Sequence, residues 1–293
     1  MPSSVIQWFP GHMAKTRRLI SECLSLVDIV IEVLDSRIPE SSKNPALDSL
    51  LGDKPRLTVF SKSSLADPEA SRLWREYYLS RGTETIFYDC RTGEGLNSIA
   101  PKVRSILGEK LERYESKGMT GRKLKAMIVG IPNVGKSSLI NALAGSSRAK
   151  VEDRPGVTLT KQWITTKVGI DLLDMPGVLW PKFEDKKVGE NLAVTGAIKD
   201  DVLDIEQLAV ILVGKLRRIA PEKLSARYKL GEMEQYTDYT DVELFTAIGK
   251  KRGFLISGGE VDYERCANML LDEFRAARIG RITLERPGQD SGD

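Results

Sequence analysis

Long apolar runs are missing from this chain of 293 residues. A membrane-spanning helix needs roughly 20 consecutive apolar residues, and no such stretch occurs in the sequence. The N-terminal segment MPSSVIQWFPGHMAKTRR has neither an apolar run nor a small-residue cleavage site, which argues against a secretory signal. We therefore expect a cytoplasmic protein that does not insert into membranes.

Cysteine and histidine are scarce. Cys23, Cys90 and Cys266 are the only cysteines, and they form neither a C-x-x-C pair nor a zinc-ligand spacing. His12 is the only histidine. The cysteines are therefore expected to be reduced thiols, and a disulfide framework is excluded.

Charge of one sign is not in large excess, because the formal net charge is only +3. Basic residues outnumber acidic ones up to residue 190, and acidic residues predominate after it. The densest basic stretch, 102–125, favours an exposed helix face and linker over a nucleic-acid contact. With 41% hydrophobic residues, the composition is that of an ordinary globular protein with a sizeable core.

Short apolar runs alternate with amphipathic stretches through the first half of the chain. The runs resemble buried parallel strands and lie at 28–37, 56–60, 85–89 and 125–130. Helical patterns cover 66–82, 95–114 and 136–145, and a hairpin is expected within 161–177. This alternation predicts an α/β fold with a doubly wound, mostly parallel sheet.

From about residue 200 the apolar residues recur three and four positions apart, as they do in amphipathic helices. These patterns span 204–219, 241–253 and 262–280, and Gly253 and Gly280 are the expected helix stops. We expect the α/β domain over 1–190, a small all-α domain over 191–286 and a disordered tail over 287–293.

The stretch GIPNVGKSS, Gly130 to Ser138, fits the phosphate-binding loop G-x-x-x-x-G-K-[ST]. That loop normally lies near the start of its domain, yet three predicted strands precede it here. SKSS (61–64) follows the second strand, where a GTPase has its base-reading N-K-x-D, and DCRTGEG (89–95) follows the third. RPGVT (154–158) and DMPG (174–177) come after the phosphate loop. This order predicts a circularly permuted P-loop GTPase domain.

Six segments in this order resemble the YlqF/RbgA family of circularly permuted ribosome-assembly GTPases over nearly the whole chain. They are WFPGHMAKTRR (8–18), DSRIPESSKNP (35–45), GIPNVGKSSLIN (130–141), RPGVT (154–158), DMPGVLWPK (174–182) and KRGFLISGGEVDYERCANMLLDEFR (251–275). The resemblance implies a GTPase that binds a late precursor of the large ribosomal subunit and its rRNA. It would hydrolyse GTP to GDP as a maturation checkpoint, slowly until docked. We expect no DNA partner and a monomer away from the ribosome.

The motifs assign roles around the nucleotide phosphates. Backbone N–H groups of the phosphate loop would cradle the phosphates at the positive N-terminus of the next helix. Lys136 would neutralise phosphate charge, the Ser137 and Thr158 hydroxyls would bind Mg²⁺, and Asp174 would hold a magnesium-bound water. The Gly177 N–H would sense the γ-phosphate. A plain turn threonine would give the same pattern at 158.

Catalysis requires a group that positions the attacking water. Val178 stands where many GTPases have a glutamine for this task, and its apolar side chain cannot orient water. An imidazole can, so we assign that role to His12, with an exposed or RNA-contacting histidine as the alternative. Asn133 could lend an oxygen to K⁺, or simply stabilise its loop.

The base-reading motif departs from the family pattern, because Ser61-Lys62-Ser63-Ser64 replaces N-K-x-D. The family's aspartate accepts two hydrogen bonds from guanine, and Ser64 is too short and uncharged to replace that pair. GTP is still the expected nucleotide, with weakened discrimination. Asp67 could reach the base only if the loop were remodelled.

The residues expected to contact the nucleotide therefore come from four loops. The predicted nucleotide-binding set is Ser61, Lys62, Ser64, Asp89, Cys90, Asn133, Val134, Gly135, Lys136, Ser137, Ser138 and Gly177. Ser137, Thr158 and Asp174 form the metal set, and His12, Lys136 and Thr158 the catalytic set.

Two alternatives share the phosphate loop. One is a nucleotide-responsive rRNA-binding scaffold in which SKSS and Val178 mark decayed catalysis. The other is a small-molecule P-loop kinase, which the permuted motif order disfavours. In the helical part, the basic residues Lys250, Lys251, Arg252, Arg275, Arg278 and Arg281 are the candidate contacts to rRNA phosphates.

Overall fold

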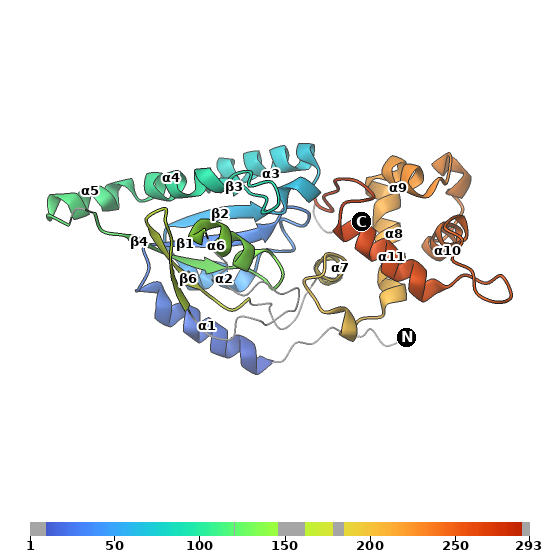
Figure 1. The fold of residues 1–293 in the computed structure, drawn as a ribbon, viewed down its shortest axis with the longest axis horizontal. Coiled ribbons are helices and arrows are strands. Elements are labelled where there is room, and N and C mark those ends of the chain that lie inside the picture. The colour runs from blue at the N-terminus through green and yellow to red at the C-terminus, as the bar shows by residue number, and fades with distance from the viewer. Residues whose placement is uncertain (1–9, 120, 146–161, 178–184, 289–293) are drawn as a thin grey trace.

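The computed structural model describes residues 10–119, 121–145, 162–177 and 185–288. An α/β part and a helical part lie side by side along the long axis of the molecule (Figure 1). In the α/β part, the strands are β1 (Ile29–Asp35), β2 (Arg56–Ser61), β3 (Thr85–Phe87), β4 (Leu124–Val129), β5 (Gln162–Thr165) and β6 (Ile170–Asp174). Its helices are α1 (Pro10–Leu24), α2 (Pro45–Leu51), α3 (Pro68–Ser80), α4 (Leu96–Ile106), α5 (Gly108–Ser116) and α6 (Lys136–Ala144).

The six strands form one sheet in the order β3-β2-β1-β4-β6-β5. All neighbouring pairs are parallel except β5 and β6, which form the predicted antiparallel hairpin. The phosphate-loop strand β4 occupies a central position although it is fourth in the chain. The mostly parallel α/β fold is therefore confirmed.

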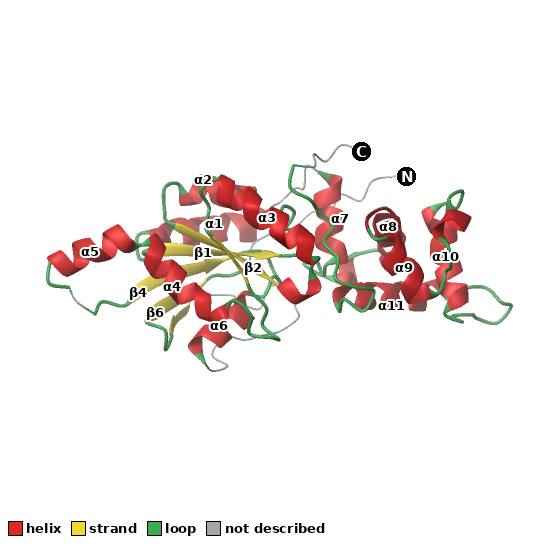
Figure 2. Ribbon diagram, turned by 90° about the horizontal axis from the view of Figure 1, so that it is seen from above, coloured by secondary structure: helices red, strands yellow, loops and turns green. Residues whose placement is uncertain are grey.

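Strand β1 shows how the sheet is covered on both faces, since all its residues are buried. Ile29, Ile31 and Val33 pack in the cluster that contains residues of α4 and α6. Val30 and Leu34 point to the opposite face, where α1, α2 and α3 supply the apolar partners. Figure 2 shows these two helical layers on either side of the sheet. Burial on both faces explains why the predicted strands are continuous apolar runs.

The helical part is built around α8 (Ile205–Ile219), which contacts all of its other helices. Those helices are α7 (Lys186–Val194), α9 (Pro221–Tyr228), α10 (Asp241–Lys251) and α11 (Tyr263–Arg275). Short 3₁₀ turns lie at Asp200–Val202 and Met233–Tyr236, and the α/β part has one at Ser63–Leu65. This confirms a helical C-terminal part.

The chain then returns to the α/β part after α11. The Ile282 N–H donates to the Leu65 carbonyl at 3.1 Å, and the Leu284 N–H donates to the Arg37 carbonyl at 2.8 Å. The indole of Trp74 donates to the Glu285 carbonyl at 3.2 Å. These bonds tie the last described segment to the segments that follow β1 and β2 and to helix α3.

Several boundaries differ from the prediction. The helix expected over 95–114 is two helices that meet at Leu107, which ends α4 and precedes α5. Helix α11 ends at Arg275 instead of at Gly280, because Ala277 adopts a left-handed φ of 55° and the Arg278 N–H turns back to the Glu273 carbonyl. Gly253 does follow the end of α10, with φ of 68°.

Helices α1, α2, α7 and α9 were not anticipated from the sequence, because they are short or lack a clear apolar period. The expected boundary after residue 190 falls inside α7, which packs on α8. Of the expected tail, residues 289–293 lie outside the described residues.

Candidate nucleotide-binding site

Three predicted nucleotide loops lie at one edge of the sheet. The base loop, residues 61–65, follows β2; the phosphate loop, residues 130–138, follows β4; and residues 174–177 follow β6. Because these strands are parallel, their carboxyl ends meet at the same edge, where α/β proteins bind ligands. Segments far apart in the sequence therefore meet at one edge of the sheet.

The phosphate loop is packed tightly against its neighbours. Gly130 has φ of 152°, and a Cβ there would lie 2.5 Å from the Val33 carbonyl oxygen of β1. A Cβ on Gly177 would lie 2.9 Å from Nζ of Lys136 and 3.0 Å from Cα of Pro132. The backbone after β6 thus lies directly against the phosphate loop.

Lys136 is buried and begins α6. Its ammonium group donates to the Gly130 carbonyl at 3.1 Å and to the Ile131 carbonyl at 2.8 Å. Burial lowers the pKa of Lys136 to about 8, against the opposing effect of the Asp174 carboxylate. Phosphate oxygens are stronger partners for an ammonium than neutral carbonyls, so this lysine is set to exchange its loop contacts for a nucleotide.

The residues expected at Mg²⁺ fit that ion chemically. Ser137 lies in the first turn of α6, and Asp174, only 3% exposed, ends the neighbouring strand β6. Both offer the hard oxygen ligands that Mg²⁺ prefers, and Mg²⁺ is usually held by few protein oxygens together with nucleotide phosphates. Thr158, the other expected ligand, lies outside the described residues.

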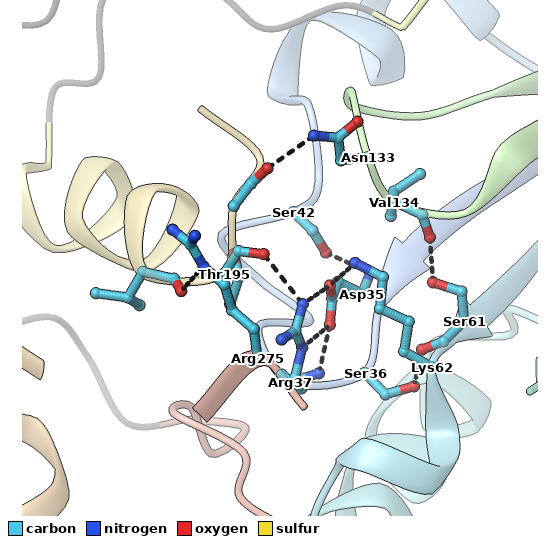
Figure 3. A network of polar contacts seen from close by, with 12 residues as sticks. Asp35, Ser36, Arg37, Ser42, Ser61, Lys62, Asn133, Val134, Thr195 and Arg275 are labelled. Carbon is cyan, nitrogen blue, oxygen red and sulfur yellow. Dashed lines mark hydrogen bonds and ion pairs between the residues drawn. The ribbon is translucent and has the colours of Figure 1, made fainter. Parts of the chain in front are cut away.

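A buried ion network lies beneath the base loop (Figure 3). Asp35, at the end of β1, accepts from Nε and Nη2 of Arg37 at 3.0 and 2.7 Å, and from Nζ of Lys62 at 2.9 Å. Burial acts to raise the pKa of Asp35, but the Arg37 and Lys62 charges outweigh it and lower that pKa. Lys62 itself adopts a left-handed φ of 56°. The network fixes the one lysine retained from the family's base-reading motif.

Asp35 and Arg37 lie in one of the segments that carry the family resemblance, but the sequence alone predicts no role for either residue. The available signal was an acidic and a basic residue two positions apart, directly after a buried strand. Such a pair at the carboxyl end of a strand points to the ligand edge of a parallel sheet.

The same network reaches the helical part. Nη2 of Arg37 donates to the Thr195 carbonyl at 3.2 Å, and Nδ2 of Asn133 donates to the Gly196 carbonyl at 2.9 Å. Arg275 of α11 donates to the Val194 carbonyl at 3.1 Å, as Figure 3 also shows. The turn after α7 therefore contacts both the phosphate loop and the base-loop network.

The base loop also contacts the loop after β3. Ser61 donates from Oγ to the Leu34 carbonyl at 2.9 Å and to the Val134 carbonyl of the phosphate loop. Ser64 donates from Oγ to Oδ2 of Asp89 at 2.5 Å, and its N–H donates to the same oxygen at 3.2 Å. Cys90, next in the chain, is exposed. The predicted residues Ser61, Lys62, Ser64, Asp89 and Val134 are thus brought together.

Of the two positions considered for orienting the attacking water, His12 and Val178, the structure describes only the first. His12 lies near the N-terminal end of α1, and Val178 lies outside the described residues. Asp67 accepts from the Ala70 N–H at 2.8 Å and so caps α3, which leaves the base loop without a remodelled aspartate.

The expected basic edge of the helical part is not a continuous free surface. Arg252 pairs with Glu273 at 2.6 Å, Arg275 pairs with Asp200 at 2.7 Å, and Arg281 donates to the Ala66 carbonyl at 2.8 Å. These guanidinium groups already bind partners within the protein, and their contact with rRNA phosphates stays a prediction. Lys250, Lys251, Arg278 and Arg281 are exposed.

Comparisons with known proteins agree with this geometry. Residues 125–240 match the family model described as 50S ribosome-binding GTPase. The chain is 46% identical over 283 residues to Ribosome biogenesis GTPase A of Bacillus cereus, covering 97% of this chain and 94% of that protein. It is 32% identical to Mitochondrial ribosome-associated GTPase 1 of Mus musculus, over 96% and 90% of the two chains. The crystal structure of GNP-bound YlqF from T. maritima shares the fold, with a TM-score of 0.62, 24% identity and coverage of 94% and 99%.

Proposed function

Since the chain belongs to the family of ribosome biogenesis GTPases and is itself a GTPase, we propose that it docks on a precursor of the large ribosomal subunit and hydrolyses GTP there as a maturation checkpoint. One observation carries the proposal: the permuted strand order brings the base loop, the phosphate loop and Asp174 to one edge of the sheet. The extent of similarity to GTPases disfavours a scaffold that has lost hydrolysis.

Each phosphate contact has a residue to make it. Lys136 would leave the Gly130 and Ile131 carbonyls to pair with β- and γ-phosphate oxygens, while backbone N–H groups from Asn133 to Ser138 enclose them. Mg²⁺, when bound, neutralises phosphate charge, and Ser137, Thr158 and Asp174 are the residues that would hold it. Gly177, whose backbone lies against the phosphate loop, would detect the γ-phosphate through its N–H.

We assign the water-positioning role to His12, which lies in α1. An imidazole titrates near neutral pH and can both accept and donate a hydrogen bond. Docking on the ribosomal particle would bring His12 to the γ-phosphate, and turnover away from the particle would therefore be slow. K⁺ beside the phosphates, with Asn133 as a ligand, belongs to the same proposal: Asn133 would turn its amide oxygen to the ion while keeping its place in the loop.

The remaining assignments concern partners. We propose that the helical part contacts rRNA phosphates through exposed lysines such as Lys250 and Lys251, and that the protein is a cytoplasmic monomer away from the ribosome. None of the described helices is long and apolar enough to cross a membrane. The division into an α/β GTPase domain and a helical ribosome-binding domain remains part of this proposal.

The decisive experiment measures phosphate release from GTP with and without purified large-subunit precursor particles. The parent should be stimulated at least tenfold, and Lys136→Ala should abolish turnover while Lys167→Ala, on the exposed turn between β5 and β6, should not. His12→Ala should bind particles normally but lose the stimulation. Unchanged stimulation in His12→Ala would overturn the catalytic assignment, and absence of stimulation in the parent would overturn the proposed function.

A further inference from the structure

Base selection in this protein has to work without the aspartate of N-K-x-D, because Ser64 occupies its position. A free serine hydroxyl is a poor substitute, since it can donate to an acceptor or accept from a donor and so distinguishes bases weakly. Guanine presents N1–H and a 2-amino group as donors on this edge, whereas N1 of adenine is an acceptor. Selection of guanine therefore requires a group that only accepts.

The contacts of Ser64 remove its ability to donate. Asp89 is 1% exposed, and burial acts to raise its pKa, but the hydrogen bonds from the Ser64 hydroxyl and from backbone N–H groups outweigh burial and lower that pKa. Asp89 is therefore ionised at neutral pH and can only accept. The hydroxyl proton of Ser64 must point at Oδ2 of Asp89, 2.5 Å from Oγ.

The position of this carboxylate is itself fixed. Oδ1 of Asp89 accepts from the N–H groups of Arg91 at 2.8 Å and Thr92 at 3.2 Å, and Oδ2 accepts from the Ser64 N–H. Nη2 of Arg91 donates to Oγ of Ser64 at 2.8 Å, which occupies one lone pair of the hydroxyl. A single lone pair remains on the half-buried Ser64 to meet a ligand.

We propose that Asp89 is a positioning residue for base selection: it accepts the hydrogen bond that the Ser64 hydroxyl donates and so turns that serine into an obligate acceptor for the donor edge of guanine. The inference rests on the proposed nucleotide site and names how that site selects its base. Adenine is rejected because its N1 lone pair would face the lone pair of Ser64. One neutral bond replaces the two charge-assisted bonds of an aspartate, so the 2-amino group of guanine contributes at most about tenfold to affinity.

The experiment is a competition titration of a labelled GTP analogue with GTP, ITP and ATP in the presence of Mg²⁺. The parent should prefer GTP over ATP by at least about tenfold and GTP over ITP by no more than about tenfold. In Asp89→Asn, the new amide can donate to Oγ and release the hydroxyl proton toward adenine N1. The GTP/ATP affinity ratio should then fall about tenfold, whereas Glu94→Gln, a matched carboxyl-to-amide change at an exposed residue of the same loop, should leave it unchanged.

A reciprocal exchange tests the same pair by a second route. Ser64→Asp alone places two carboxylates in contact and should weaken binding of every nucleotide. Ser64→Asp combined with Asp89→Ser restores an aspartate to the base loop with a hydroxyl to support it. This double variant should bind GTP more tightly than the parent and discriminate more strongly against ITP.

The outcomes separate this inference from the proposed function. A GTP/ATP ratio within twofold of the parent in Asp89→Asn, or a double variant no better than Ser64→Asp, would overturn the role of Asp89 even if particles still stimulate hydrolysis. A parent that binds ATP as well as GTP would overturn it too. A parent that binds no nucleotide would remove the proposed function and this inference together.

Discussion

Replacing Arg37 with methionine should destabilise the protein strongly. The Arg37 and Asp35 side chains are 2% and 3% exposed, and their two hydrogen bonds measure 3.0 and 2.7 Å. Methionine keeps much of the volume but leaves the Asp35 carboxylate with only Lys62 as a charged partner. Breaking a buried pair by removing one partner costs about 3–5 kcal/mol, and the retained Lys62 places this variant near the lower value.

Thermal unfolding followed by circular dichroism checks this value. A loss of about 3 kcal/mol corresponds to a fall in Tm of about 6–12 °C. Arg72→Met is the matched control, because Arg72 is 54% exposed and its pairs with Glu69 and Glu76 are screened by water, so only a small change in Tm is expected. Equal Tm losses in the two variants would refute the assignment of a buried, stabilising network.

The pH dependence gives a second check. Arg37 and Lys62 depress the pKa of Asp35, so its contribution to stability is present above the unfolded-state pKa of about 3.9 and is lost as pH falls through the lower folded-state pKa. In Arg37→Met, the pKa of Asp35 in the folded protein is higher than in the parent. Lowering the pH therefore protonates this carboxyl in the variant and removes the charge that has lost its Arg37 partner. The Tm difference between parent and variant should therefore narrow between about pH 7 and about pH 4. A difference that widens with acid would contradict the reasoning.

Two further predictions concern buried charges elsewhere. The pKa of Lys136 is about 8 in the free protein and should rise when phosphates bind, so the affinity for GDP should fall about fourfold between about pH 7 and about pH 8.5. Calorimetry measures this affinity, and Lys136→Arg should show no such pH dependence. A GDP affinity of the parent that does not change with pH would refute the linkage. Glu273→Gln should lower stability by about 3 kcal/mol, because this carboxylate, 4% exposed, accepts from Arg227, Tyr228 and Arg252. Chemical denaturation measures the free energy of unfolding of this variant and of Glu234→Gln, a matched change at an exposed position. Similar losses of stability in both variants would count against a structural role for Glu273.

Much of the fold could be predicted because its signals are local. The centres of the runs 28–37 and 125–130, IVIEVL and AMIV, are apolar at nearly every position, which is typical of strands covered on both faces. The phosphate loop is a fixed spacing of glycines, lysine and serine, and the order of the motifs along the chain is enough to indicate the permutation. Helices such as α7 and α9 were missed because eight or nine residues give too few turns for a clear period.

The strand and loop order, the phosphate loop and the loss of the base-reading aspartate follow from the sequence alone. Which side chains meet depends on the tertiary structure: Ser64 and Asp89 are 25 positions apart, and Arg37 and the Thr195 carbonyl are 158 apart. Such contacts depend on which strands are neighbours and where each carboxyl end points. Hydrogen bonds form only within a few tenths of an ångström of the right distance, which no local pattern encodes.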